Sequence, residues 1–304
     1  MQHTSTVFMV RPVNFAFNEQ TALSNAFQDT TMRELEVHNK ALSEFDSFVD
    51  ILRENGVKVM VIDDKPDPYT PDSIFPNNWI STHRDGKIFI YPMEANNRRF
   101  ERRPEILDEL RRNFKIESEI DLSYLESEQK FLEGTGSMVL DRQNHLAYAC
   151  ISPRTDKRAL NIFCDLSGYN PVIFHATMKN GEPIYHTNVM MCVGELFSVI
   201  CLECIMDDTE RKNVSNILQA SGKEIVVISY EQMKQFAGNM LELRNNNGES
   251  LLIMSGQAHQ SLKPDQLTIL TKYCKIVSSP LNTIETCGGG SARCMIAEIY
   301  LEKV

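Results

Sequence analysis

The sequence has no long apolar run and no excess of positive charge. None of its apolar runs approaches the roughly 18 residues that a membrane-spanning helix needs, so we expect no membrane segment. Its 41 acidic residues outnumber its 31 basic ones, and the formal net charge is −10. An acidic chain is poorly suited to nucleic acid or to an anionic lipid surface. The composition therefore favours a soluble protein whose partners are small molecules.

Cysteine is also scarce, with 8 in 304 residues, which is too few for a disulfide scaffold. Most cysteines lie in apolar runs such as "FSVICLECI" and are interpreted as reduced thiols, which predicts a cytoplasmic location. Cys201 and Cys204 form a lone C-x-x-C, a weak metal signal without a second pair, so we expect no metal and no cofactor. The start, "MQHTSTVFMVRP", lacks a basic region followed by a long apolar one, so no secretory signal is expected.

What the sequence does contain is a hairpin that recurs at a regular step. Pairs of apolar strands such as "EGTGSMVLD" and "HLAYACIS" are predicted, with a helix and a further strand between one pair and the next. The five openings are 58, 53, 53 and 52 residues apart and lie near Phe75, Glu133, His186, Asn239 and Ser291. A step of this size is typical of repeat and propeller architectures.

We therefore predict an α/β fold in which five pseudo-symmetric ββαβ-type units close around an axis as a five-bladed propeller. The last opening strand, in "ARCMIAEIYLEK", can pair with the N-terminal strand "TVFMVRP". No Pro- or Ser-rich linker interrupts the chain, so residues 1–304 are predicted to form one domain. The alternative is an ordinary α/β domain with accidental spacing. Helices are predicted from Thr31 to Asn55 and from a cap at Asp207 or Asp208 to Gly222.

In a radial array, the residues that open the inner strands face one another even when they are far apart in sequence. They are Asp72, Asn77 and Asn78 in the first unit, Glu133 in the second, His186 and Asn188 in the third, Asn239 in the fourth and Cys294 in the fifth. A thiolate is a strong nucleophile that a histidine can activate, and a carboxylate can orient a substrate NH₂ or a water. Each residue alone has an ordinary structural explanation. Their shared register is what indicates a catalytic site.

Two cysteines near the C-terminus are candidates for the nucleophile. Cys294 opens an apolar strand after three glycines, which let the backbone approach a ligand, so we choose it. Cys287 precedes the glycines and is expected to pack. The segment "IETCGGGSAR" has the composition of a flexible lid. Trp79, directly after Asn78, is expected to fill the core rather than to wall the site.

These segments resemble the guanidino-group-modifying superfamily, the pentein fold of arginine deiminases, dimethylarginine hydrolases and amidinotransferases. Over nearly the whole chain the sequence is similar to the citrulline utilization hydrolases of the CtlX type. "GGGSARCM" is similar to the segment with the deiminase nucleophile, which implies that role for Cys294. "HTNV" lies where the family has H-x-D and "EGTGSMVLD" on its E-G-G-D region. The resemblance implies that His186 is the general acid and base and that Glu133 is a substrate-binding carboxylate.

Other motifs imply contacts with an amino-acid substrate. "PDSIFPNNW", with Asp72, resembles the P-D-S-V-F-x-E-D segment of the dimethylarginine hydrolases. "ISPRTDKRA" resembles their S-x-R-T segment, in which an arginine holds the substrate α-carboxylate, and this maps to Arg154. Arg98 and Arg99 in "NNRRFERRP" are weaker candidates, since the stretch is also typical of the solvated start of a helix. Such enzymes are commonly dimers, so a homodimer is among the expectations.

The chain departs from the deiminase pattern at two positions. Asn78 stands where the family carboxylate contacts the guanidinium, and Asn188 stands at the aspartate of H-x-D. A buried guanidinium needs anionic partners, whereas a neutral ureido group offers a carbonyl to which an amide can donate. The exchanges thus predict L-citrulline as the substrate, unless they reflect drift in a tolerant pocket. They also predict a Cys294–His186 ion pair in the free enzyme, because a neutral substrate cannot help to ionise the thiol.

Two alternatives stay open at this point. An arginine or methylarginine deiminase, or an amidinotransferase, would use the same site on a different substrate. A pentein that only binds, such as the ribosome anti-association factors, would lack the cysteine, histidine and glutamate that this chain carries in register.

Overall fold

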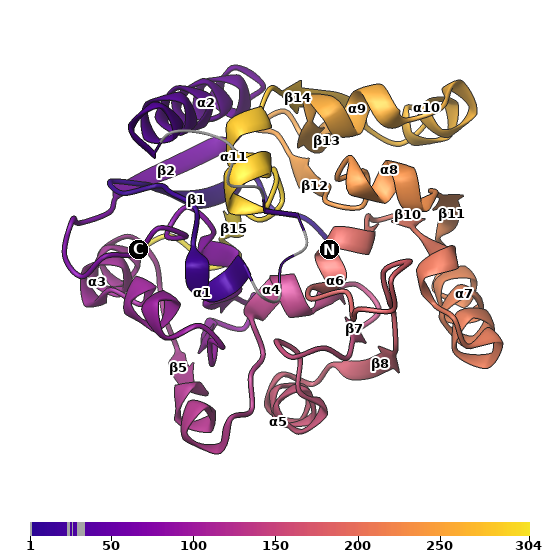
Figure 1. Cartoon of the computed structure of the whole chain (residues 1–304), viewed down its shortest axis with the longest axis horizontal. Helices are drawn as coiled ribbons and strands as arrows, with labels where there is room; N and C mark the ends of the chain where they lie inside the picture. The colour runs from indigo at the N-terminus through magenta and orange to yellow at the C-terminus, as the bar shows by residue number, and fades with distance from the viewer. Residues whose placement is uncertain (1, 23–24, 26, 29–33) are drawn as a thin grey trace.

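The computed structural model describes residues 2–22, 25, 27–28 and 34–304, which form five small sheets around a central axis (Figure 1). The strands are β1 (Thr6–Arg11), β2 (Lys58–Asp63), β3 (Ile80–Thr82), β4 (Lys87–Ile90), β5 (Ser118–Asp121), β6 (Val139–Asp141), β7 (Leu146–Cys150), β8 (Asn170–Phe174), β9 (Met191–Val193), β10 (Phe197–Ile200), β11 (Glu224–Val227), β12 (Leu241–Arg244), β13 (Ser250–Ser255), β14 (Lys275–Ser279) and β15 (Ala297–Glu298). The α-helices are α1 (Glu19–Ala22), α2 (Glu34–Glu54), α3 (Pro104–Asn113), α4 (Gly134–Ser137), α5 (Lys157–Ser167), α6 (Thr187–Met190), α7 (Asp208–Ala220), α8 (Tyr230–Lys234), α9 (Gly256–Ser261), α10 (Pro264–Leu270) and α11 (Asn282–Gly288). The 3₁₀ helices are η1 (Pro76–Asn78), η2 (Asn96–Glu101), η3 (Ser123–Glu128) and η4 (Leu202–Cys204).

Each sheet has three strands, and the middle strand pairs antiparallel with one neighbour and parallel with the other. The orders are β15-β1-β2, β3-β4-β5, β6-β7-β8, β11-β10-β9 and β12-β13-β14. In the sheet of the second hairpin, β7 pairs antiparallel with β6 and parallel with β8. A parallel partner needs a crossover connection, which α5 supplies here. The predicted five-bladed α/β propeller of ββαβ-type units is confirmed.

The first sheet closes the ring with the two ends of the chain. β1 pairs antiparallel with β15, where Val7 lies opposite Glu298, and parallel with β2. Figure 1 shows the indigo start of the chain and its yellow end in this sheet. The predicted pairing of the N-terminal strand with the last opening strand is therefore confirmed.

The two helices predicted from the sequence are present. α2 covers Glu34–Glu54, and the first three residues of that prediction, 31–33, lie outside the described residues. In α7 the cap is Asp207, whose carboxylate accepts two backbone N–H groups of the first turn. Gly222 follows the helix with a φ of 81°, a conformation that glycine adopts without strain.

The strands predicted to start at the hairpin openings start later than expected. The first three openings fold as the short helical turns η1, α4 and α6, and β3, β6 and β9 begin only after them. A helical residue advances about 1.5 Å against about 3.3 Å in a strand, so a helical turn keeps more side chains near the axis. Glu133 and His186 take the N-cap positions of α4 and α6. Their shared register therefore exists, but on helical turns.

The apolar core is divided into clusters between the sheets and the outer helices. Trp79 is fully buried in one cluster with Phe8 and Ile88, as expected for a core residue. Among the described residues, none of the helices combines the length and the apolarity that crossing a membrane requires.

Candidate active site

A pocket near the axis gathers residues that are far apart in sequence. Six of the predicted site residues line it: Asp72, Asn78, Arg98, Arg154, His186 and Cys294. The rest of the wall is formed by Asn25, Phe75, Tyr185 and Gly288–Gly290. None of the six predicted residues is more than 3% exposed. Because buried polar groups must be matched, their hydrogen bonds decide which substrate group the pocket can accept.

His186 and Glu133 form the central hydrogen bond of the site. Nε2 of His186 lies 2.8 Å from Oε2 of Glu133, and both side chains are buried. An ionised carboxylate only accepts hydrogen bonds, so Nε2 carries the proton and Nδ1 is the basic nitrogen. Burial lowers the pKa of His186 to about 4, and the Glu133 carboxylate offsets only part of this effect. The imidazole is therefore neutral at pH 7 and can accept a proton at Nδ1.

Glu133 lies behind the imidazole and is held by several partners. Burial raises the pKa of its carboxyl group, but Arg154, His186 and Arg98 together outweigh burial and hold that pKa well below its usual range. Guanidinium nitrogens of Arg154 and Arg98 lie 3.6 and 3.7 Å from Oε2. Oε1 accepts the backbone N–H of Glu94 at 3.0 Å. In this arrangement the carboxylate orients the imidazole, and the substrate contact that we expect of Glu133 stays a prediction.

Cys294 lies just before β15, and two amides contact its sulfur. Sγ accepts hydrogen bonds from Nδ2 of Asn188 at 3.4 Å and from Nδ2 of Asn239 at 3.2 Å. Across the described part of the chain, no hydrogen bond joins Cys294 to His186. The structure thus does not contain the expected contact between Cys294 and His186. Asn188 lines a second, axial cavity and not the pocket.

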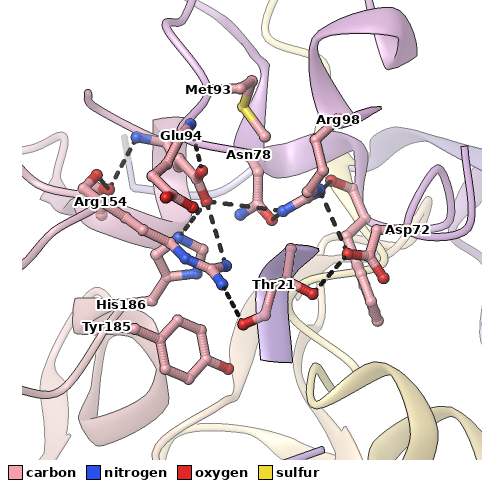
Figure 2. A network of polar contacts seen from close by, with 12 residues as sticks. Thr21, Asp72, Asn78, Met93, Glu94, Arg98, Arg154, Tyr185 and His186 are labelled. Atoms are coloured by element: carbon pink, nitrogen blue, oxygen red, sulfur yellow. Dashed lines mark hydrogen bonds and ion pairs between the residues drawn. The ribbon is translucent and has the colours of Figure 1, made fainter. Parts of the chain in front are cut away.

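Arg98 fixes the orientation of the Asn78 amide (Figure 2). Nη1 of Arg98 donates to Oδ1 of Asn78 at 2.9 Å, and a guanidinium has no acceptor, so the amide must present its oxygen. Nε and Nη2 of Arg98 donate to the Glu101 carboxylate at 2.8 and 3.0 Å, which holds the guanidinium in place. Nδ2 of Asn78 has no hydrogen-bond partner among the described residues. Asn78 therefore offers an unused N–H donor in the pocket.

Of the three arginines predicted to bind substrate, Arg98 and Arg154 line the pocket and Arg99 does not. Nη2 of Arg154 donates to the carbonyl of Thr21 at 3.1 Å, and its guanidinium lies 5.1 Å from the centre of the Tyr185 ring (Figure 2). Arg99 donates instead to two backbone carbonyls of the preceding loop, at 3.0 and 3.2 Å. Consecutive residues of a 3₁₀ turn point about a third of a turn apart, so only one of two adjacent arginines on η2 can face the pocket.

Asp72 has one oxygen engaged and one available. Oδ2 accepts hydrogen bonds from Asn18 at 2.7 Å and from the hydroxyl of Thr21 at 3.3 Å. Burial raises the pKa of Asp72, while Arg98, 3.7 Å from Oδ2, acts in the opposite direction. Oδ1 is buried and has no hydrogen-bond partner within the described ranges. The carboxylate can therefore accept a hydrogen bond from a ligand.

The glycine segment before the nucleophile packs as a wall of the pocket. Residues 282–288 form α11, and Gly289 ends this helix with a φ of 63°. The carbonyl of Gly289 accepts a hydrogen bond from the Tyr185 hydroxyl at 2.5 Å. A Cβ on Gly290 would lie 2.8 Å from the Phe75 ring, closer than packed atoms approach. These glycines allow the segment to pack closely against its neighbours.

Several residues of the site escaped the sequence reasoning. A Cβ on Gly136 would lie 2.4 Å from Nδ2 of Asn78 and 2.8 Å from Nδ1 of His186, so both groups converge over this glycine. The sequence did indicate Gly136 by its position in the repeat. It follows the second hairpin opening by three residues, as Asn78 follows the first. Tyr185 and the contact of Asn239 with the sulfur had no signal beyond their neighbours in sequence.

The cysteines outside the pocket pack in the core. All eight cysteines are buried, and Cys287 packs in an apolar cluster, as expected. The sulfurs of Cys201 and Cys204 lie 3.0 Å apart. One group of described residues has a spacing suited to a metal ion: His3, Glu195 and Glu242. Arg244 lies 3.1 Å from the Glu195 carboxylate, and its positive charge opposes a cation there.

An α/β propeller of five three-stranded sheets that gathers a cysteine, a histidine and a carboxylate near its axis is a pentein. The sequence profile of the family described as "N,N dimethylarginine dimethylhydrolase, eukaryotic" matches residues 11–301, and the chain belongs to this family. No curated protein sequence matches the chain.

Solved structures share the fold at low identity. The substrate-bound N-terminal domain of ArgZ, an arginine dihydrolase from the ornithine–ammonia cycle in cyanobacteria, is 13% identical with a TM-score of 0.76, and 98% of each chain is covered. Unliganded AgrE is 15% identical with a TM-score of 0.76, over 98% of this chain and 39% of AgrE. An adduct of dimethylarginine dimethylaminohydrolase with S-methyl-L-thiocitrulline is 14% identical with a TM-score of 0.65, over 98% and 100%. The chain thus spans one domain of the longer relatives.

Proposed function

We propose that the protein hydrolyses a carbon–nitrogen bond in the ureido group of L-citrulline, or of a close analogue, with Cys294 as the nucleophile. The observation that carries this proposal is the hydrogen bond from Arg98 to Asn78, because it leaves an N–H donor in the pocket. The carbonyl oxygen of a ureido group can accept from this donor. A guanidinium has only N–H donors, so its N–H group would face the N–H group of Asn78 with no acceptor between them. An unmatched buried donor costs about 1–3 kcal/mol, which predicts a preference of about tenfold or more.

The second exchange of aspartate for asparagine supports the same substrate for another reason. Nδ2 of Asn188 lies 3.4 Å from the nucleophilic sulfur, so an aspartate there would place a carboxylate beside the developing thiolate. Two negative charges at this distance repel each other strongly when water does not screen them. A cationic substrate can offset that repulsion, and a neutral ureido group cannot. An amide at this position therefore suits the neutral substrate.

In the first chemical step, Nδ1 of His186 accepts the thiol proton while Sγ of Cys294 forms a bond to the ureido carbon. The electron pair of the C=O bond moves to the oxygen, to which the Asn78 amide donates a hydrogen bond. When this pair returns, the bond between carbon and the δ-nitrogen breaks, and that nitrogen takes the proton from His186. Ornithine leaves, and an S-carbamoyl enzyme remains.

In the second step, Nδ1 of His186 takes a proton from water, and the resulting hydroxide adds to the carbamoyl carbon. The C–S bond breaks with its electron pair on sulfur, and the thiolate recovers a proton from His186. Carbamic acid leaves and decomposes to CO₂ and ammonia. Glu133 stabilises the transient imidazolium in both steps, because its carboxylate is bound to Nε2–H.

Two further side chains suit the ends of an amino acid. The Arg154 guanidinium lines the pocket with the fork geometry that matches an α-carboxylate. Asp72 has an available carboxylate oxygen in the same pocket for an α-ammonium group. Solved relatives of this fold include AgrE bound to L-arginine and AgrE bound to ornithine, which supports an amino-acid substrate here. Eight buried thiols suit the reducing cytoplasm that we predict.

The comparisons favour a second candidate within the same class. The family is named for dimethylarginine hydrolysis, and ArgZ is an arginine dihydrolase of the same fold. A chain that accepts arginine would first release ammonia from the guanidinium and would then treat the citrulline as above. An amidinotransferase would need a second amine in place of water. A pentein that only binds a ligand has no use for a nucleophile beside an oriented imidazole.

The deciding experiment incubates the purified protein with L-citrulline, L-arginine and dimethylarginine in parallel and quantifies ornithine, citrulline and ammonia. We expect ornithine and ammonia from citrulline, and no turnover in Cys294→Ala. Citrulline accumulating from arginine would identify a deiminase, and ornithine formed from arginine faster than from citrulline would identify a dihydrolase. Either result would overturn the ureido preference.

A further inference from the structure

We propose that Asn239 is a catalytic residue that, together with Asn188, holds the negative charge of the Cys294 sulfur in a cradle of two amides. The inference rests on the proposed role of Cys294 as nucleophile, but it concerns how the thiolate is made rather than which substrate it attacks. It replaces the expected ion pair with His186 by two neutral hydrogen-bond donors.

Asn239, in the fourth unit of the propeller, contacts the third and fifth units at once. Its Nδ2 donates to Sγ of Cys294 at 3.2 Å and to the backbone carbonyl of Asn188 at 3.0 Å. Its Oδ1 accepts the backbone N–H of Arg293 at 3.0 Å. The side chain is fully buried, so water does not compete for these bonds. Since Oδ1 is bound to an N–H group, the amide can only present its NH₂ to the sulfur.

The imidazole cannot take over this task in the free protein. His186 is committed to Glu133 at 2.8 Å through Nε2, and burial keeps its ring neutral at pH 7. A ring that stays neutral carries no positive charge with which to hold a thiolate in the free protein. The amide of Asn188, 3.4 Å from Sγ, is the only other donor that the described residues bring to the sulfur.

The chemical step balances with these groups alone. The S–H bond of Cys294 breaks with its electron pair on sulfur, and in the free protein the proton passes to water, because His186 stays neutral. The two amide N–H groups then bind an anion instead of a weakly accepting thiol, and hydrogen bonds to charged groups are about twice as strong. When the thiolate attacks carbon, its negative charge moves to the substrate oxygen. The two amides are then in contact with a neutral sulfur.

The test measures the pH dependence of Cys294 alkylation by iodoacetamide, with the modified peptide followed by mass spectrometry. We expect Asn239→Ala to raise the pH midpoint by about one to two units, because it removes a hydrogen bond to a charged group. We expect His186→Ala to leave the midpoint where it is. The opposite pattern, a midpoint that rises in His186→Ala and stays in Asn239→Ala, would restore the ion pair and overturn the proposal. A midpoint that neither variant moves would overturn it as well.

A second variant separates the loss of the donor from a loss of structure. Asn239→Asp keeps the shape and the acceptor for the Arg293 N–H but replaces the amide donor by a carboxylate beside the sulfur. Its midpoint is expected to rise further than in Asn239→Ala, and a midpoint equal to the wild type would refute the role. Asn247→Ala, an exposed asparagine in the turn after β12, is the matched control and is expected to behave like the wild type. Alkylation needs no substrate, so this result stands even if the citrulline assay fails.

Discussion

The guanidinium of Arg98 lies 2.9 Å from the amide oxygen of Asn78, and this contact sets the polarity of the pocket. With a carboxylate at position 78, both oxygens would be acceptors, and one would be free to bind a guanidinium. With the amide, the free group is a donor. Asn78→Asp is therefore expected to lower kcat/KM for citrulline by about tenfold or more and to raise arginine binding.

The test compares both substrates in the wild type, in Asn78→Asp and in Asn246→Asp, a control that changes the same residue type on the exposed hairpin turn. Arginine binding by calorimetry with the nucleophile removed separates affinity from turnover. An Asn78→Asp enzyme that keeps the wild-type ratio of citrulline to arginine would rule out this residue as the selector.

Gly136 provides a second prediction, because its missing side chain makes room for two functional groups. A Cβ there would lie 2.4 Å from the Asn78 amide nitrogen and 2.8 Å from Nδ1 of His186, so both must move in Gly136→Ala. We expect turnover to fall at least about a hundredfold, as small displacements of reacting groups do. Gly256→Ala is the matched control, since a Cβ there meets its nearest atom at an ordinary 3.6 Å. Equal activity in the two variants would contradict the assignment.

The fold could be predicted from the sequence because the pattern that specifies it repeats along the chain. Apolar strand pairs recur with a nearly constant step, and the pairing of the chain ends follows once five units close in a ring. The helical turns at the openings could not be predicted in this way. Segments such as "GTGS" and "TNVM" are four residues long, about one helical turn, so they cannot show a repeating apolar pattern, and tertiary contacts between neighbouring units decide their conformation.

The residue types of the site could be predicted, but not their division of labour. Arg98 and Arg99 are equivalent in sequence, and the direction of each side chain is set only by its place on η2. The sequence does not distinguish a flexible glycine from a closely packed one. Gly290 is closely packed because it lies against the Phe75 ring, which is more than 200 residues earlier in the chain. The partners of a buried sulfur likewise depend on Asn239, on another unit of the propeller.

The different positions of Arg154 and Arg99 lead to a third prediction. Arg154 lines the pocket, whereas Arg99 supports a loop outside it. Arg154→Ala is expected to raise KM for the amino-acid substrate at least about tenfold, since a bond between charged groups is lost. Arg99→Ala is expected to keep KM within about twofold. Steady-state kinetics on both variants decides the point, and a larger increase of KM in Arg99→Ala would reverse the two roles.

Glu285 provides a prediction on stability and pH. Its side chain is 1% exposed, and Oε1 accepts the hydroxyl of Ser291 at 2.5 Å, whose backbone carbonyl in turn accepts the N–H of Cys294. Burial raises the pKa of Glu285 to about 7, and hydrogen bonds from Ser255 and Ser291 offset only part of this effect. The folded protein thus binds this proton more tightly than the unfolded chain, where a glutamate has a pKa of about 4.3.

The stabilisation from this proton is complete below about pH 4 and is lost as the pH rises through about 7. Between pH 5 and pH 8 the wild type is expected to lose about 2–3 kcal/mol of unfolding free energy from this group, because each unit of pKa difference is worth about 1.4 kcal/mol. Glu285→Gln stays neutral and keeps an acceptor for Ser291, so the excess of its unfolding free energy over that of the wild type is expected to be about 2–3 kcal/mol larger at pH 8 than at pH 5. Urea unfolding at both pH values measures this difference, with Glu54→Gln, at the exposed end of α2, as the control. Parallel pH profiles of the wild type and Glu285→Gln would show that the carboxyl group is ionised in the folded protein throughout this range.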